Sequence, residues 1–151
     1  MKVVDEKEYL TDVLGREAVS FIERNRDHPY FLYLPFNAIH SPMQASTYYM
    51  KRFAGIADQH RRVFAAMLSA MDDAIGAVLR KLEPNTLVIF ISDNGGPVQE
   101  FTSRNLPLTG QKGQMYEGGI RIPFMLQGKP PIKDGRTVDE SVAPVGQLPT
   151  S

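Results

Sequence analysis

Two neighbouring residues with oxygen-bearing side chains, Asp93 and Asn94, follow an apolar run and precede two glycines. A carboxylate and an amide oxygen side by side are hard ligands, which suit Ca²⁺ or Mg²⁺ better than zinc. The glycines allow the backbone to come close to a ligand. Turn chemistry alone favours a simple Asp-Asn-Gly-Gly turn at this place. The four residues therefore predict either part of a cation site or a turn.

His40 and Lys112 are the side chains that could act on an anion. His40 stands in a loop before Ser41-Pro42, where an imidazole can donate to an anionic oxygen or act as an acid. Lys112 has a glycine on either side and could place a positive charge against an anionic group. By residue type alone, each is more typical of an exposed loop residue.

Other charged residues predict less chemistry. Asp72 and Asp73 are adjacent, and neighbours on a helix point about 100° apart, so a solvated helix face is favoured over an acid–base pair. Glu117 could satisfy backbone amides or pair with Arg121. The sequence contains no cysteine, which excludes disulfides, thiolate metal sites and cysteine nucleophiles within it.

The elements that must position these residues alternate between helices and apolar strands. Apolar residues recur at three- and four-residue spacing over Tyr9–Arg26 and His60–Leu82, which predicts two amphipathic helices. The apolar runs Tyr30–Leu34 and Leu87–Ile91 predict strands that are covered on both faces. A third strand is expected at Ile120–Leu126, at an edge or bulge because it contains a proline.

This order of elements predicts an α/β fold with a mostly parallel sheet flanked by helices. Ligands of such sheets bind at the carboxyl ends of strands, and both His40 and Asp93 follow such ends. Residues 97–119 are expected to form a long functional loop, and residues 127–151 an irregular tail. Three strands and two helices make a thin core for this fold, so we expect the chain to be part of something larger.

The composition excludes several classes of protein. The 151 residues, 42% hydrophobic and 23% charged, suit one globular domain. The 17 Lys plus Arg balance the 17 Asp plus Glu, and no dense basic run occurs, so no nucleic-acid partner is expected. No apolar run approaches the roughly 20 residues that span a bilayer, and the first residues lack the apolar region of a signal peptide. We therefore expect neither a membrane span nor a leader.

Four segments, in this order, resemble the sulfatase family: Tyr30–Leu34 with Ile39–Pro42; Met71–Gly76; Leu87–Gly96; and Gly110–Gly113 leading into Tyr116–Pro123. The resemblance covers residues 9–126 and implies that 1–151 form a single, partial catalytic domain of a type I, formylglycine-dependent sulfatase. Its fold would be part of an alkaline-phosphatase-like α/β sandwich. Its reaction would be hydrolysis of a sulfate monoester, with a sulfated small molecule or glycan as substrate. Family members work in periplasmic, lysosomal or secreted compartments, and the same is expected here.

The resemblance also implies roles for individual residues. Asp93 and Asn94 match the family's ligands to one Ca²⁺ ion. Lys112 matches the lysine that neutralises sulfate charge, and His40 matches the histidine near the leaving-group oxygen. The family's Cys/Ser-x-Pro-x-Arg motif, which supplies the formylglycine nucleophile, has no match in this sequence, and neither does its early Asp-Asp pair. We therefore expect the chain to be inactive on its own.

Two alternatives remain open. A phosphatase or phosphodiesterase on the same fold would normally carry several zinc-binding His and Asp residues, whereas this sequence has only His28, His40 and His60. The other alternative is a non-catalytic remnant that retains a weak metal site.

Overall fold

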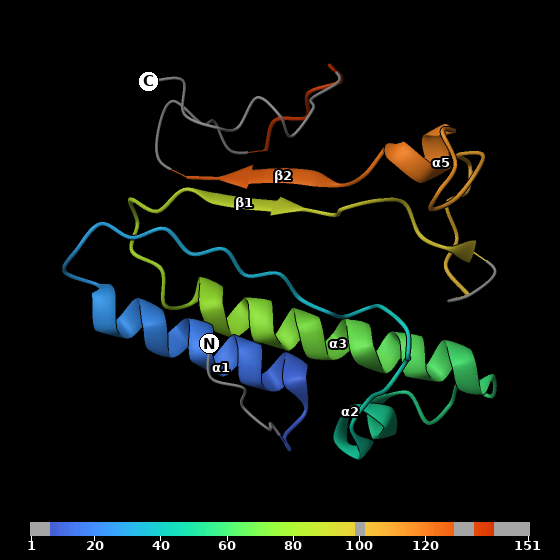
Figure 1. Ribbon diagram of the computed structural model, residues 1–151, viewed down its shortest axis with the longest axis horizontal. Coiled ribbons are helices and arrows are strands. Elements are labelled where there is room, and N and C mark those ends of the chain that lie inside the picture. Colours follow the sequence, from blue (N-terminus) through green and yellow to red (C-terminus); the bar gives the residue numbers. More distant parts are fainter. Residues whose placement is uncertain (1–6, 99–101, 129–134, 141–151) are drawn as a thin grey trace.

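The structure is a computed structural model that describes residues 7–98, 102–128 and 135–140. Along the chain, its elements are α1 (Leu10–Asn25), α2 (Thr47–Arg52), α3 (Gln59–Leu79), β1 (Val88–Ile91), α5 (Glu117–Ile120) and β2 (Phe124–Gln127). Helices α1 and α3 lie together on one side of the two strands, and α5 stands at the end of the sheet where β2 begins (Figure 1). The α/β class predicted from the sequence is confirmed. Most of the predicted tail, 127–151, lies outside the described residues.

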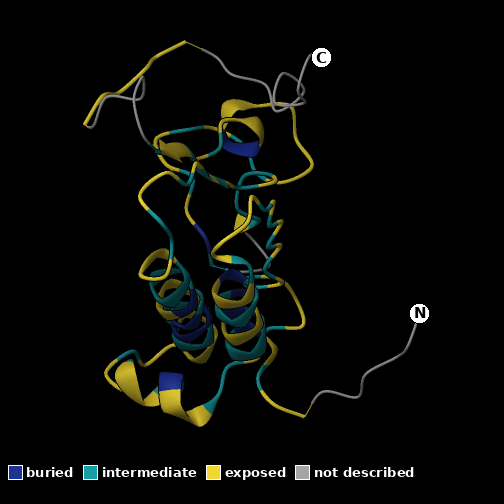
Figure 2. Ribbon diagram, turned by 90° about the vertical axis from the view of Figure 1, so that its left-hand side faces the viewer, coloured by how far each residue is buried: buried dark blue, intermediate teal, exposed yellow. Residues whose placement is uncertain are grey.

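Both predicted helices are confirmed, and their contact forms the core. The side chain of Asp58 caps α3 by accepting a hydrogen bond from the backbone N of Arg61 at 2.6 Å. The buried positions are dark in Figure 2 where the two helices face each other. These positions carry mostly small side chains: Thr11, Gly15, Ala18 and Ile22 on α1, and Ala66, Met67, Ala70 and Ala74 on α3. Small residues allow the helices to approach closely, and a Cβ atom added at Gly15 would lie 2.7 Å from the Cβ of Ala74.

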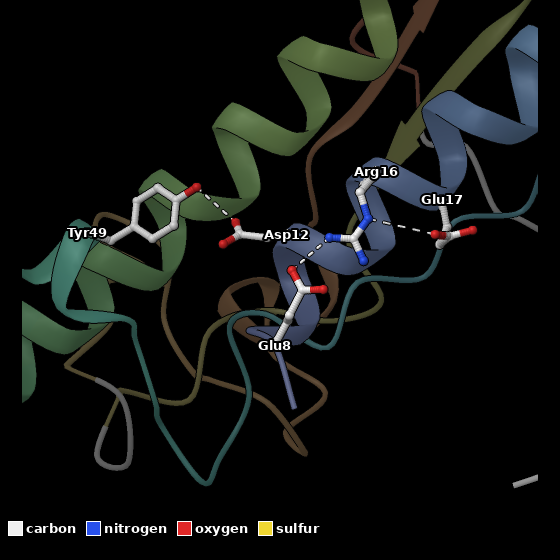
Figure 3. Close-up of polar contacts among 5 residues, drawn as sticks. All are labelled: Glu8, Asp12, Arg16, Glu17 and Tyr49. Carbon is white, nitrogen blue, oxygen red and sulfur yellow. Dashed lines mark hydrogen bonds and ion pairs between the residues drawn. The ribbon is translucent and has the colours of Figure 1, made fainter. Parts of the chain in front are cut away.

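The short helix α2, which the sequence did not predict, ties these two helices together. Tyr49 is buried and its phenol donates to Oδ1 of Asp12 on α1 at 2.9 Å (Figure 3). Arg52 lies over the rings of Tyr48 and Tyr49 and forms an ion pair of 2.7 Å with Asp73 on α3. The prediction that Asp72 and Asp73 lie on a solvent-exposed helix face is confirmed. Asp73 also has a cationic partner there, Arg52.

Charged pairs also support the first turns of α1. The guanidinium of Arg16 donates to Oε2 of Glu8 at 2.8 Å and lies 3.8 Å from a carboxylate oxygen of Glu17 (Figure 3). The hydrogen bond from Arg16 lowers the pKa of the Glu8 carboxyl. All three side chains are exposed, so the pairs contribute little to stability.

The sheet in the described residues has two strands, and they are antiparallel. Val88 pairs with Gln127 and Ile91 with Phe124. Strand β1 lies where it was predicted. Strand β2 is shorter than the predicted strand Ile120–Leu126 at its start, because Ile120 belongs to α5 and the pairing begins only after Pro123. The parallel pairing expected from the sequence is not present between these two strands. Ile89 and Ile91 are 43% and 37% exposed, so the prediction that β1 is covered on both faces is wrong for this chain.

The prediction of a strand at Tyr30–Leu34 is also wrong, because this segment does not pair with the described sheet. The segment is extended and runs in the same direction as β1, between the helix pair and the strands (Figure 1). Alternate side chains are half-buried, while Phe31 and Tyr33 are 88% and 77% exposed. A strand covered on both faces needs packed layers on both sides, and the described helices supply one.

None of the helices in the described part of the chain has the length and apolarity needed to cross a membrane.

Candidate functional site

The structure brings two of the predicted site residues into contact. Nζ of Lys112 lies 3.0 Å from Nε2 of His40, although 72 residues separate them in the sequence. His40 follows the extended segment after α1, and Lys112 belongs to the loop before α5. Both side chains are exposed, so an anion in solvent could reach them. The predicted loop 97–119 thus contributes at least one candidate site residue, and its last three residues form the start of α5.

The contact defines the form of the His40 ring. The ammonium of Lys112 has only hydrogens to offer, so it donates and Nε2 of His40 accepts. The other ring nitrogen, Nδ1, lies 2.9 Å from the backbone O of Ser41 and must donate to it. The hydrogen bonds therefore assign a neutral imidazole with its proton on Nδ1. The lone pair of Nε2 faces the positive charge.

Glycines shape the loop that carries Lys112. Gly110 and Gly113 have φ angles of +92° and +82°, in the region that other residues rarely adopt. A Cβ atom at Gly110 would also lie 2.6 Å from the Cβ of Tyr116. The sequence Gly-Gln-Lys-Gly is thus explained by the backbone conformation that directs the lysine toward His40.

Asp93 and Asn94 lie in the turn that ends β1. The hydroxyl of Ser92 donates to the backbone O of Asn94 at 2.9 Å, and the backbone N of Gly95 donates to the O of Gly119 at 2.9 Å. A Cβ atom at Gly95 would lie 1.8 Å from the O of Gly118, so this glycine is required by close packing against α5. Asp93 is exposed and Asn94 is half-buried. The backbone therefore bends at Asp93 and Asn94, and the Asp93 carboxylate is presented to solvent.

The donor chemistry of this turn fits part of a Ca²⁺ site. Ca²⁺ takes about six to eight oxygen ligands, and Asp93 and Asn94 offer a carboxylate and an amide oxygen. Within the described ranges, no group of three or more His, Cys, Asp or Glu residues could hold a metal ion. These two side chains could therefore act as ligands only together with oxygens from elsewhere.

Sequence reasoning missed the side chains that connect these loops. Asn105 hydrogen-bonds the backbone of Gly96 and Gly110, and Oε1 of Gln111 accepts from the backbone N of Val98 at 2.8 Å. Their partners are backbone groups of distant residues, which leave no pattern in a sequence. The role of Ser92 could have been predicted from the sequence, because a serine hydroxyl often hydrogen-bonds the backbone of the residue two positions later.

Glu117, at the start of α5, pairs with Arg121 at 3.6 Å, which is one of the two roles expected for it. Both side chains are exposed, and the pair spans one helical turn. A cavity of about 280 Å³ lies at the other end of the sheet, between Leu79, Val88 and Gln127. It is distant from the residues that could carry chemistry, because Val88 begins the strand that Asp93 follows.

An imidazole and an ammonium in contact, on loops of an α/β chain, are typical of a site for an anionic group. Comparison with known proteins identifies the family. The family described as Sulfatase matches residues 2–151. The chain therefore belongs to the sulfatase family, whose members are hydrolases.

Individual relatives agree with this assignment. The chain is 44% identical to arylsulfatase J of Mus musculus over 73% of the chain's own residues. It is 33% identical to steryl-sulfatase of Homo sapiens over 93% of them. It is also similar to a crystal structure of Ps i-CgsB in complex with k-i-k-neocarrahexaose, with a TM-score of 0.78 and 40% identity over 84% of this chain. These alignments support the alkaline-phosphatase-like α/β fold that the resemblance implied.

The chain covers only part of each relative. It spans 19% of arylsulfatase J, 25% of steryl-sulfatase and 30% of the Ps i-CgsB chain.

Proposed function

We propose that this chain is the central part of a sulfatase catalytic domain that hydrolyses sulfate monoesters. The observation that carries the proposal is the 3.0 Å contact between Lys112 and His40, two residues chosen from family motifs that lie far apart in the sequence. The substrate class is a sulfated small molecule or glycan. The named relatives are sulfatases, which favours a sulfate ester over the phosphate ester considered as an alternative.

Lys112 and His40 would act on the sulfate group and its leaving oxygen. Hydrolysis breaks the bond between sulfur and the bridging oxygen, and the departing alcohol must gain a proton. The ammonium of Lys112 would neutralise negative charge on the sulfate oxygens. This stabilisation lowers the barrier when it acts on the charge that develops in the transition state. Nε2 of His40 would face the leaving oxygen once an anion draws the ammonium away from it. Because Nε2 carries no proton in the contact with Lys112, it would take up a proton from water before donating one to the departing alcohol.

Asp93 and Asn94 would supply two of the ligands of one Ca²⁺ ion. When bound, the ion would add positive charge against the sulfate oxygens. The nucleophile and the remaining ligands would come from segments outside this chain, since the Cys/Ser-x-Pro-x-Arg motif is absent from its sequence. The chain alone is therefore inactive in this proposal.

The mostly parallel sheet also belongs to the complete domain. The segment 30–34 has the direction of β1 and exposes Phe31 and Tyr33 on one side. Further strands and helices of a longer protein would cover that side and complete the sandwich. A periplasmic, lysosomal or secreted location is part of the same proposal.

The sulfate-binding role of Lys112 can be tested without catalytic activity. We expect inorganic sulfate, added to the isotope-labelled chain, to shift the NMR signals of the His40 ring and the Lys112 side chain. Lys112→Ala should abolish the response of His40, because the ammonium that attracts the anion is lost. Lys51→Ala removes the same charge from an exposed position on α2 and should leave the response unchanged.

A wild-type titration without movement at His40 would contradict the proposal. In a longer protein that carries the nucleophile motif, Lys112→Ala should lower kcat/KM by about 10²–10³-fold, as loss of one charge-stabilising donor typically does. Turnover of a chromogenic aryl sulfate by the isolated chain would contradict the proposal that its nucleophile lies elsewhere.

The metal-binding role has a separate test. A ligand that binds only the folded state raises the midpoint of thermal unfolding. We expect millimolar Ca²⁺ to raise the midpoint of the wild-type chain slightly, because two ligands make a weak site, and to leave Asp93→Ala unchanged. Asp72→Ala, an exposed carboxylate on α3, should retain the wild-type shift. An equal shift in Asp93→Ala would show that the ion binds elsewhere.

A further inference from the structure

The side chain of Asn105 joins the turn that carries Asp93 and Asn94 to the loop that carries Lys112. Its Nδ2 donates to the backbone O of Gly96 at 2.8 Å and to the backbone O of Gly110 at 3.0 Å. Its Oδ1 accepts from the backbone N of Gly96 at 3.2 Å. An asparagine amide has two donor hydrogens and one acceptor oxygen, so all its groups are engaged.

These bonds fix both the position and the orientation of the turn after β1. Gly96 is held through its N–H and its C=O, much as a residue in a strand is held by its neighbour. Gly96 lies two residues after Asn94, and Gly110 lies two residues before Lys112. The planar amide of Asn105 therefore links the two loops directly, beside the backbone bonds from Gly95 to Gly119 and from Gly118 to Thr109.

The backbone at both ends of this link permits no side chain. A Cβ atom at Gly96 would lie 2.6 Å from Oγ of Ser103 and 3.2 Å from Oδ1 of Asn105. Gly110, as described above, combines a positive φ with close packing against Tyr116. Glycine at both positions brings bare backbone within hydrogen-bond distance of one short side chain. Glutamine at 105 would be one methylene too long to keep the same bonds.

We infer that Asn105 is a positioning residue that holds the turn of Asp93 and Asn94 at a fixed distance from the loop of Lys112, so that Lys112 reaches His40. The importance of that distance for sulfate chemistry rests on the proposed function. The dependence of the Lys112–His40 contact on Asn105 does not. Gln111 adds a second link between the same segments, but it attaches at Val98, farther along the chain from Asp93.

The ring nitrogens of His40 report directly on this contact. In the 151-residue chain labelled with ¹⁵N-histidine, Lys112→Ala defines the ring spectrum without the contact. We expect Asn105→Ala to move the Nε2 signal of His40 most of the way toward that reference. Asn105→Asp keeps the side-chain volume and the bond from Gly96 N but loses both donated bonds, so it should move the signal in the same direction. Asn85→Ala, at an exposed turn, should leave the signal at its wild-type position.

The outcome separates positioning from a purely structural role. A structural role would lower the midpoint of thermal unfolding in the Asn105 variants without moving the His40 ring signal. Folded Asn105→Ala or Asn105→Asp with wild-type ring signals would therefore overturn the inference. The wild-type chain gives an independent reading, because the Asn105 side-chain amide protons should exchange with solvent more slowly than those of Asn85, and equal rates would also overturn it. If inorganic sulfate leaves His40 unmoved in the wild-type chain, the proposed function fails while this result still decides the role of Asn105.

Discussion

Tyr49 is the residue whose protonation most clearly affects the folded state. The residue is 6% exposed, and its phenol donates to the carboxylate of Asp12. Burial raises the pKa of Tyr49, and the hydrogen bond to Asp12 acts in the same direction because an ionised phenol would lose that bond and face a carboxylate. The folded state therefore favours the neutral phenol more strongly than the unfolded state does.

This difference predicts a loss of stability in alkaline solution. The contribution of Tyr49 is fully present below the unfolded pKa of about 10 and is lost as the pH rises from there toward the folded pKa. Tyr49→Phe should lower the free energy of unfolding by about 1 kcal/mol near neutral pH through the lost hydrogen bond. The same variant should show a shallower alkaline decline, measured by urea unfolding across that range. Tyr33→Phe alters a phenol on a side chain that is 77% exposed and should change neither quantity.

At the scale of elements, the packing of α1 on α3 depends on Gly15. Alanine is favoured over glycine inside a helix by about 1 kcal/mol. At position 15, however, the Cβ of an alanine would lie 2.7 Å from the Cβ of Ala74 and 3.2 Å from the Cα of Ala74. Overpacking of this kind costs about 1–3 kcal/mol, so we expect Gly15→Ala to lower the free energy of unfolding. Denaturant unfolding of the variant measures the change.

Gly76 on α3 offers a matched control for this substitution. A Cβ atom at Gly76 would meet only the guanidinium of Arg80, at 3.3 Å, and that flexible side chain can move. Gly76→Ala should therefore stabilise the chain by up to about 1 kcal/mol through helix propensity. Stabilisation by both substitutions would contradict the close approach of the two helices.

At the scale of the whole molecule, apolar side chains remain exposed along one extended segment. Phe31 and Tyr33 are 88% and 77% exposed, and their two-residue spacing places them on the same side of the backbone. Exposed apolar surface is typical of a region that another part of a protein covers. The aligned part covers only 19%, 25% and 23% of three relatives, which agrees with the proposed larger domain.

We expect the double variant Phe31→Ser, Tyr33→Ser to bind less of an apolar fluorescent dye than the wild-type chain and to scatter less light at high concentration. Its free energy of unfolding should stay within about 0.5 kcal/mol of wild type, because surface substitutions rarely do more. Ile22→Ser, at a side chain that is 1% exposed, should instead unfold the helix pair. Unchanged dye binding in the double variant would argue against this segment as the exposed apolar surface.

Much of this molecule could be predicted from short-range patterns. The apolar period located α1 and α3, and the β-branched run located β1, because burial of one helix face or one strand depends mainly on neighbouring residues. The direction and register of strand pairing could not be predicted in this way, since they depend on which strand lies next to β1. The small-residue contact between Gly15 and Ala74 was missed for the same reason, because neither residue is distinctive within its own helix.

The sequence by itself determined the types of residue in the candidate site, the family motifs that contain them and the helices and strand that precede them. Only the tertiary structure decided that Lys112 meets His40, that the proton of His40 is on Nδ1, and that Asn105 connects two loops. Each of these depends on groups that are distant along the chain, and a hydrogen bond forms only when folding brings donor and acceptor to about 3 Å. Residue type limits which bonds are possible, and the packing of the elements selects among them.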